Sequence, residues 1–131
     1  MSAALQIHDE TSTGQRTASA TLTLASDRVT AREVLRRRIE QEVDAFNRAK
    51  PEYFKGLVQP TDAEQELNGY RLRKQRVLDW REQFAAAETA FANNGFLMLV
   101  GDRQIDDLDE EIVVTPGLSV SFVRLVPLVG G

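Results

Sequence analysis

The residue types that most often carry out catalysis are scarce in this chain of 131 residues. Cysteine is absent, and the only histidine is His8. This composition excludes disulfides, thiolate metal sites and a cysteine nucleophile, and it disfavours histidine metal clusters and a Ser–His–Asp centre. We expect His8 to be a strand residue with a satisfied ring. Because no set of residues supplies a nucleophile, a base and an orienting group together, the sequence does not predict an enzyme, a metal site or a bound cofactor.

The charged residues include one acidic run and two basic runs. The net charge of −4 argues against a nucleic-acid-binding protein, which needs a cationic surface. The acidic run at residues 106–111 lacks the glycine and the ligand spacing of a calcium loop. We expect a solvated loop there, with a surface that steers a basic partner as the alternative. The basic runs at residues 36–38 and 71–76 are expected to be solvated faces, with phosphate contact as the alternative.

The first part of the chain changes from strand periodicity to helix periodicity. Apolar and polar residues alternate around Leu5 and Ile7 and again over residues 18–24, which predicts two strands joined by a loop at Asp9–Arg16. Thr30-Ala31-Arg32-Glu33 then has the form of a capping box. Apolar residues follow at helical spacing, so we expect a helix from Ala31 to Arg48.

Residues 51–93 are broken by prolines and glycines into short pieces. We expect a short helix at Asp62–Leu67. A second capping box at Asp79–Glu82 predicts a helix that runs to Asn93, and Asn94-Gly95 is typical of the residues that end a helix.

The last part of the chain is predicted to be extended. The apolar run Phe96–Val100 predicts a strand buried on both faces, and Arg103–Ile105 a short return strand. A turn at residues 115–117 leads into a final strand over Ser119–Val126. In that strand Val120 and Phe122 share one side, and the other side carries Val123 and Leu125.

Together these elements predict an α+β fold in which one sheet is covered by a main helix. We expect a single domain over residues 1–131, with a helical insertion at about 51–93 and a flexible tail at 126–131. No apolar run approaches the ~20 residues that span a bilayer, and residues 1–7 do not have the pattern of a signal peptide. Together with the lack of cysteine, this favours a cytoplasmic protein without membrane contact.

The order of these elements and the tail, residues 122–131 (FVRLVPLVGG), resemble a ubiquitin-like β-grasp protein. The apolar-Pro-x-Val-Gly-Gly ending is most similar to the small subunit of molybdopterin synthase and to related sulfur carriers. The resemblance covers roughly residues 3–48 and 94–131. Residues 51–93 depart from it, because compact members have only a short connection there, and this insertion suggests a bacterial ubiquitin-like subfamily.

The resemblance implies a protein that is the substrate of an ATP-dependent activating enzyme. The carboxylate of Gly131 would be adenylated and passed to a target, with a conjugating enzyme as a further partner. Gly130 and Gly131 have no Cβ, so they can pass through a narrow channel. Pro127 stiffens the base of the tail. An apolar docking surface for the activating enzyme is expected from residues beside the tail, namely Val123, Leu125, Pro127, Leu128 and Val129.

Two alternatives to the protein modifier stay open at the level of sequence. A sulfur carrier would instead convert the Gly131 carboxylate to a thiocarboxylate. A non-covalent interaction subunit would use the fold alone, and Gly130-Gly131 would then be a frayed end. The insertion favours the protein modifier, since it adds a recognition surface that sulfur delivery does not require.

Overall fold

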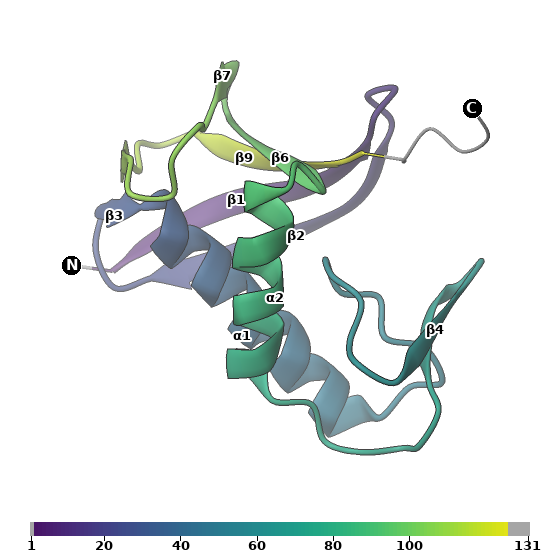
Figure 1. Ribbon diagram of the computed structural model, residues 1–131. Helices are drawn as coiled ribbons and strands as arrows, with labels where there is room; N and C mark the ends of the chain where they lie inside the picture. Colours follow the sequence, from purple (N-terminus) through teal and green to yellow (C-terminus); the bar gives the residue numbers. More distant parts are fainter. Residues whose placement is uncertain (1, 126–131) are drawn as a thin grey trace. The chain divides into compact units, whose positions relative to one another are not determined.

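The structure is a computed structural model, and it describes residues 2–125. Within these residues the fold is α+β, with a mixed sheet and two helices (Figure 1). In chain order the elements are β1 (Ala3–Thr11), β2 (Arg16–Leu24), β3 (Arg28–Thr30), α1 (Ala31–Ala49), β4 (Ala63–Glu66), β5 (Gly69–Leu72), α2 (Trp80–Ala92), β6 (Phe96–Val100), β7 (Arg103–Gln104), β8 (Glu111–Val113) and β9 (Ser119–Arg124).

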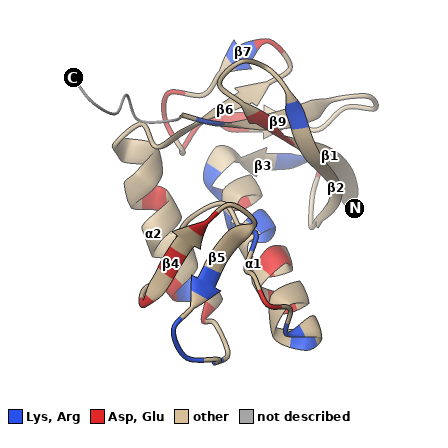
Figure 2. Cartoon of the chain, turned by 90° about the vertical axis from the view of Figure 1, so that its right-hand side faces the viewer, with Lys and Arg blue, Asp and Glu red and all other residues tan. Residues whose placement is uncertain are grey.

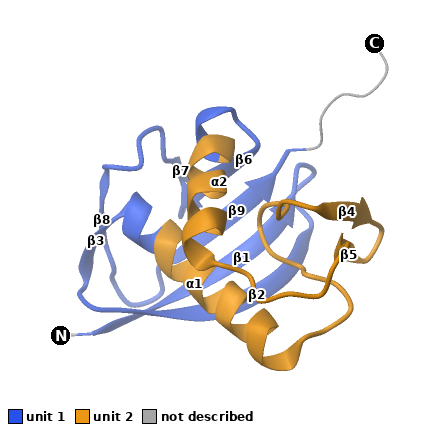
Figure 3. Cartoon of the chain, turned by 60° about the horizontal axis from the view of Figure 1, so that its bottom comes forward, with its two compact units in different colours: residues 1–34, 91–131 blue, residues 35–90 orange. Residues whose placement is uncertain are grey.

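The chain divides into two compact units (Figure 3). Unit 1 comprises residues 1–34 and 91–131, and unit 2 comprises residues 35–90. Unit 1 contains the five-stranded sheet and the β3–β8 ribbon, whereas unit 2 contains most of both helices and the β4–β5 ribbon. Most of the predicted insertion falls within unit 2. The single domain over residues 1–131 stays a prediction.

The sheet of unit 1 has the strand order β2-β1-β9-β6-β7. Strand β1 is antiparallel to β2 and parallel to β9, and β9 is antiparallel to β6. The predicted N-terminal hairpin is confirmed, but its loop is shorter than expected. It occupies residues 12–15, because the Thr11 amide donates to the Gln15 carbonyl at 2.8 Å and Gly14, with φ +89°, closes the turn.

Alternating residues of these strands form the core of unit 1. The buried side chains include Leu5, Ile7, Leu22, Leu24, Phe96, Met98, Val120 and Phe122. The prediction that residues 96–100 are buried on both faces is wrong. Leu97 and Leu99 are only half-buried, because their side of β6 belongs to the opposite face of the sheet.

A short ribbon that the sequence did not predict holds the start of α1. Strand β3 pairs with β8, and the Ala31 amide donates to the Glu110 carbonyl at 2.9 Å. The Thr30 hydroxyl accepts a hydrogen bond from the Glu33 amide at 3.2 Å. This bond confirms the predicted helix start, and α1 then runs to Ala49, one residue beyond the predicted end.

In unit 2 the short helix expected at Asp62–Leu67 is wrong, because residues 63–66 form strand β4. Asp62, which precedes β4, has φ +53°, and Gly69, the first residue of β5, has φ +130°. Tyr70 of β5 exchanges backbone hydrogen bonds of 2.8 and 2.9 Å with Phe54. Residues 63–66 pair with β5, which Phe54 holds in place, and this pairing overrides the helical propensity of the Ala-Glu-Gln-Glu segment.

The second predicted helix is confirmed as α2. An Asp79 carboxylate oxygen accepts a hydrogen bond from the Arg81 amide at 3.0 Å, which caps the first turn. At the other end Asn94 has φ +58°, the left-handed conformation that commonly follows a helix.

Candidate functional site

The candidate site lies where the last strand leaves the sheet. Within unit 1, Val123 of β9 lies between Glu10 of β1 and Leu97 of β6. The Leu125 amide then donates to the Gly95 carbonyl at 3.3 Å. The path of the chain is therefore fixed by backbone pairing through Leu125, immediately before the predicted tail.

Apolar side chains from two strands share the half-buried face of the sheet at this end. Val123 is paired directly with Leu97, and Leu99 lies at the next alternate position of β6. Leu125 lies at the next alternate position after Val123 along the chain. All four side chains are intermediate in exposure. We call Leu97, Leu99, Val123 and Leu125 the docking face.

The opposite side of β9 is anchored in the core. Val120 and Phe122 have no exposed surface, and the Phe122 ring lies 6.1 Å from the ring of Phe96. The prediction that Val120 and Phe122 share one side of the strand is thus confirmed, and the structure shows that this side is the buried one. Because β9 is paired on both edges and packed through Phe122, the docking face is held on a fixed strand.

The structure describes two of the predicted site residues, Val123 and Leu125. The other predicted residues, Pro127, Leu128, Val129, Gly130 and Gly131, lie outside the described part of the chain. Leu97 and Leu99 were not predicted as site residues, because a run of five apolar residues indicates burial on both faces. The register against β9 is what assigns them to the docking face.

The same face becomes polar toward β1 and β2. The Gln6 side chain donates to the Thr21 hydroxyl at 2.9 Å, and the His8 ring lies 2.8 Å from the Ser19 hydroxyl. The prediction that His8 is a strand residue with a satisfied ring is confirmed. The docking face is therefore an apolar area bordered by hydrogen-bonded polar side chains, which is the usual composition of a protein interface.

The acidic run forms a loop whose carboxylates bond to nearby groups. The Glu110 carboxylate accepts the Asp106 amide at 2.9 Å and contacts the Arg103 guanidinium at 2.5 Å. The pKa of Glu110 is lowered, chiefly by the hydrogen bond from the Asp106 amide and further by the Asp107 amide and Arg103. Asp109 pairs with Arg32 at the start of α1. These bonds give the acidic residues a role in shaping the loop.

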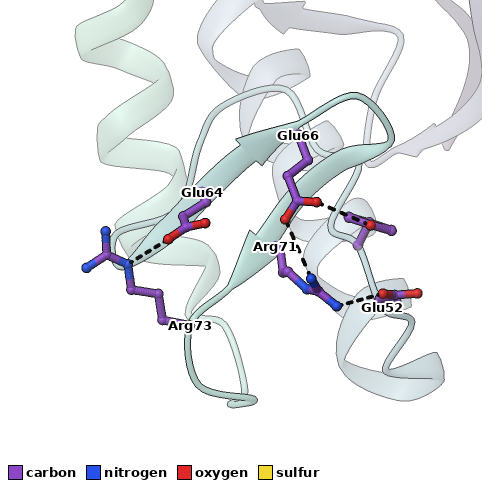
Figure 4. Close-up of polar contacts among 6 residues, drawn as sticks. Glu52, Glu64, Glu66, Arg71 and Arg73 are labelled. Carbon is purple, nitrogen blue, oxygen red and sulfur yellow. Dashed lines mark hydrogen bonds and ion pairs between the residues drawn. The ribbon is translucent and has the colours of Figure 1, made fainter.

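The basic runs are largely paired with carboxylates within unit 2. Figure 2 shows acidic positions on β4 and basic positions on and after β5, and Figure 4 shows that their side chains meet. Arg73 lies 3.7 Å from Glu64. Arg71 lies 2.9 Å from Glu52 and also contacts Glu66. The expectation that residues 36–38 form a solvated face is wrong in part, because one residue of this run is buried.

Arg38 of that run is only 5% exposed, and its Nε lies 3.3 Å from the Glu42 carboxylate. The other Glu42 oxygen accepts the Leu57 amide at 3.1 Å. A charge that is removed from water in this way requires such a partner. The sequence could not reveal it, because the basic run looks the same whether a side chain is exposed or buried.

Over residues 2–125, no group of three or more His, Asp and Glu side chains is arranged to hold a metal ion. In the same residues no helix has both the length and the apolar character needed to cross a membrane. No family model matches the chain, and comparisons with curated proteins and with solved structures likewise found no match. The assignment of a function therefore depends on the fold, the docking face and the sequence of residues 122–131.

Proposed function

We propose that the chain is a ubiquitin-like protein of β-grasp fold whose Gly131 carboxylate is adenylated by a partner enzyme and transferred to a target protein. The observation that carries the proposal is the position of β9 in the middle of the sheet, parallel to β1. In a β-grasp the N-terminal hairpin and a central, parallel last strand have this relation, and the chain leaves the sheet from its centre.

The docking face supports the proposal by its place in the chain. Val123 and Leu125 directly precede residues 126–131, and Leu97 is brought to them by the register of β6. An enzyme that activates the end of the chain must grip the folded body close to that end. A half-buried apolar face on a rigid strand suits this purpose, because little ordering is required on binding.

The proposed chemistry needs no catalytic group from this chain. The α-carboxyl group has a reference pKa of about 3.5, so at neutral pH it is an anion and a poor acyl donor. An oxygen of the carboxylate attacks the α-phosphorus of ATP, and pyrophosphate leaves. A nucleophile of the target then attacks the carbonyl carbon of the acyl-adenylate, and AMP leaves. Gly130 and Gly131 present no side chain to obstruct either step.

Transfer to a protein and formation of a thiocarboxylate differ only in the second nucleophile. Sulfide equivalents would give a thiocarboxylate, and an amine of a target protein would give an amide. We favour the amide, because unit 2 adds a folded surface that sulfur delivery does not need. The non-covalent alternative differs from both, since it makes no use of the Gly131 carboxylate.

Three variants expressed in the source cells, each carrying an N-terminal epitope tag, test the proposal. Wild-type protein is expected to give additional bands that persist on denaturing gels. Gly130→Ala is expected to reduce them strongly, and a variant with one residue added after Gly131 is expected to lose them. Val123→Asp should also reduce them, while the protein stays folded by circular dichroism. Covalent products that are unchanged in the extended variant would overturn the proposal.

A further inference from the structure

Two Asn-Gly pairs occur in the chain, Asn68-Gly69 and Asn94-Gly95. Asparagine is chemically labile, because the backbone nitrogen of the next residue can attack its side-chain amide. A glycine in the next position has no side chain to obstruct this attack. The attack also requires the asparagine backbone to rotate, so it is fast only where the chain is loosely held. The first pair lies in unit 2 and the second in unit 1, and their surroundings differ.

Asn68 lies at the tip of the β4–β5 ribbon (Figure 4). It forms a two-residue turn with Leu67, since Glu66 pairs directly with Gly69. Both turn residues are exposed, Leu67 completely. Within residues 2–125 the Asn68 side chain has no hydrogen-bond partner. A ribbon of two strands is weakly stable by itself, and its tip is where local opening begins.

Asn94 is held from both sides within unit 1. Its amide donates to the Phe91 carbonyl at 3.1 Å, at the end of α2. The carbonyl of Gly95 accepts the Leu125 amide at 3.3 Å, and the Phe96 side chain that follows is buried. A rotation of the backbone at Asn94 would therefore break hydrogen bonds and move a core residue. The same rotation at the tip of the ribbon disturbs only its last strand pair.

We infer that Asn68 is a site of spontaneous deamidation, and that it reacts much faster than Asn94 in the folded protein. The Gly69 nitrogen gives up its proton and attacks the carbon of the Asn68 side-chain amide. The bond from this carbon to the amide nitrogen then breaks, and ammonia leaves with the proton. A water molecule opens the resulting succinimide ring. Attack on the side-chain carbonyl gives aspartate, whereas attack on the main-chain carbonyl gives isoaspartate.

Isoaspartate would change the ribbon that carries it, because it adds a carbon atom to the backbone between residues 68 and 69. Glu66 pairs with Gly69 across a turn of two residues, so a longer turn displaces the register of β4 against β5. We expect the ribbon to open from its tip as the protein ages. This inference is independent of the proposed function of Gly131, since the reaction involves only Asn68, Gly69 and water.

Peptide mapping of the full-length protein after incubation at mildly alkaline pH measures both reactions. Trypsin releases Asn68 within residues 56–71 and Asn94 within residues 82–103. Each deamidation raises the mass of its peptide by about 1 Da, and fragmentation distinguishes a change at Asn94 from one at Asn93. We expect Asn68 to react at least about tenfold faster than Asn94 in the folded protein. In guanidinium chloride the two rates should agree to within about threefold, because the unfolded chain holds neither site.

Two variants separate the added charge from the added backbone atom. Asn68→Asp carries the charge alone, and Asn68→Ser cannot form the succinimide. Brief digestion of the folded protein with trypsin, which cuts after Arg71 of β5, reports whether the ribbon has opened. Incubated wild-type protein should be cut there at least about threefold faster than fresh protein. Fresh Asn68→Asp should be cut at the rate of fresh wild-type protein, and Asn68→Ser should not change on incubation.

The inference is wrong if Asn68 and Asn94 react at equal rates in the folded protein, or if Asn94 is the faster. It is also wrong if residues 56–71 gain mass only in guanidinium chloride, because the turn would then be held closed. Faster cutting after Arg71 in fresh Asn68→Asp would assign the opening of the ribbon to the charge, and would contradict the role of isoaspartate. A protease that cuts before aspartate and spares isoaspartate identifies the product, and aspartate alone would contradict the effect on the ribbon.

Discussion

Neighbouring residues of β9 are predicted to respond very differently to substitution, because they lie on opposite faces of the sheet. Phe122 has no exposed surface and contacts Phe96, whereas Val123 is half-buried on the docking face. Phe122→Ala removes a buried aromatic side chain, for which the expected loss in the free energy of unfolding is about 3–5 kcal/mol. That loss is a large share of the stability of an ordinary domain.

Val123→Thr is the matched change on the other face. Threonine keeps the β-branched shape that suits a strand, and it exchanges one methyl group for a hydroxyl. Full burial of a valine side chain is worth roughly 1.5–3 kcal/mol, and only part of this applies to a half-buried residue whose hydroxyl can reach water. We therefore expect Val123→Thr to cost less than about 1 kcal/mol.

Urea denaturation followed by far-ultraviolet circular dichroism measures both values by linear extrapolation. The two variants should differ by at least about 2 kcal/mol. A loss of about 2 kcal/mol or more for Val123→Thr would refute the reasoning, because it would mean that the hydroxyl is buried without a partner. The apolar residues of the docking face would then belong to the core, and they would not be accessible to an activating enzyme.

Three further predictions concern contacts within each unit. Gly56→Ala should lower the free energy of unfolding by about 1–3 kcal/mol, since a Cβ there would lie 2.1 Å from the Phe54 ring, and thermal unfolding measures the loss. Glu42→Gln should cost about 3–5 kcal/mol, because it removes the charge of the carboxylate that pairs with the buried guanidinium of Arg38, and the same assay would contradict this with a change below about 1 kcal/mol. The pKa of Glu110 is lowered in the folded protein. The stability that this carboxylate contributes is therefore fully present above the pKa of Glu110 in the unfolded chain, and it is lost as the pH falls through the pKa in the folded protein. An NMR titration that gives Glu110 a pKa at or above the ordinary glutamate value would contradict this.

Much of the fold is predictable from the sequence where local and non-local forces agree. The helix α1 shows a capping residue, an apolar stripe and a terminating segment together, and each agrees with the structure. Strand β9 is predicted for the same reason, because alternation and the preceding turn both favour an extended chain. Residues 62–67 show the opposite case. Their own composition favours a helix, but residues 63–66 pair as a strand with β5. Tyr70 of β5 is in turn held by Phe54, which is distant in sequence.

The candidate site was predictable in part. Val123 and Leu125 follow from alternation along a single strand, which is visible in the sequence. Leu97 depends on which residue of β6 pairs with Val123, and a one-residue slip would place it on the other face. The buried ion pair of Arg38 was missed for a related reason, because burial of a charge is decided by elements distant in sequence.

Peptide mapping of the protein isolated from its source cells shows whether Gly131 is joined to a target protein. Trypsin cuts after Arg124, so residues 125–131 are released as one peptide when their carboxyl end is free, and they remain attached to a target peptide when it is conjugated. We expect target peptides that carry residues 125–131 through the Gly131 carbonyl. If residues 125–131 are recovered only with a free carboxylate, in preparations from cells in which the protein is functional, Gly131 is not transferred to a target and the proposed function is wrong.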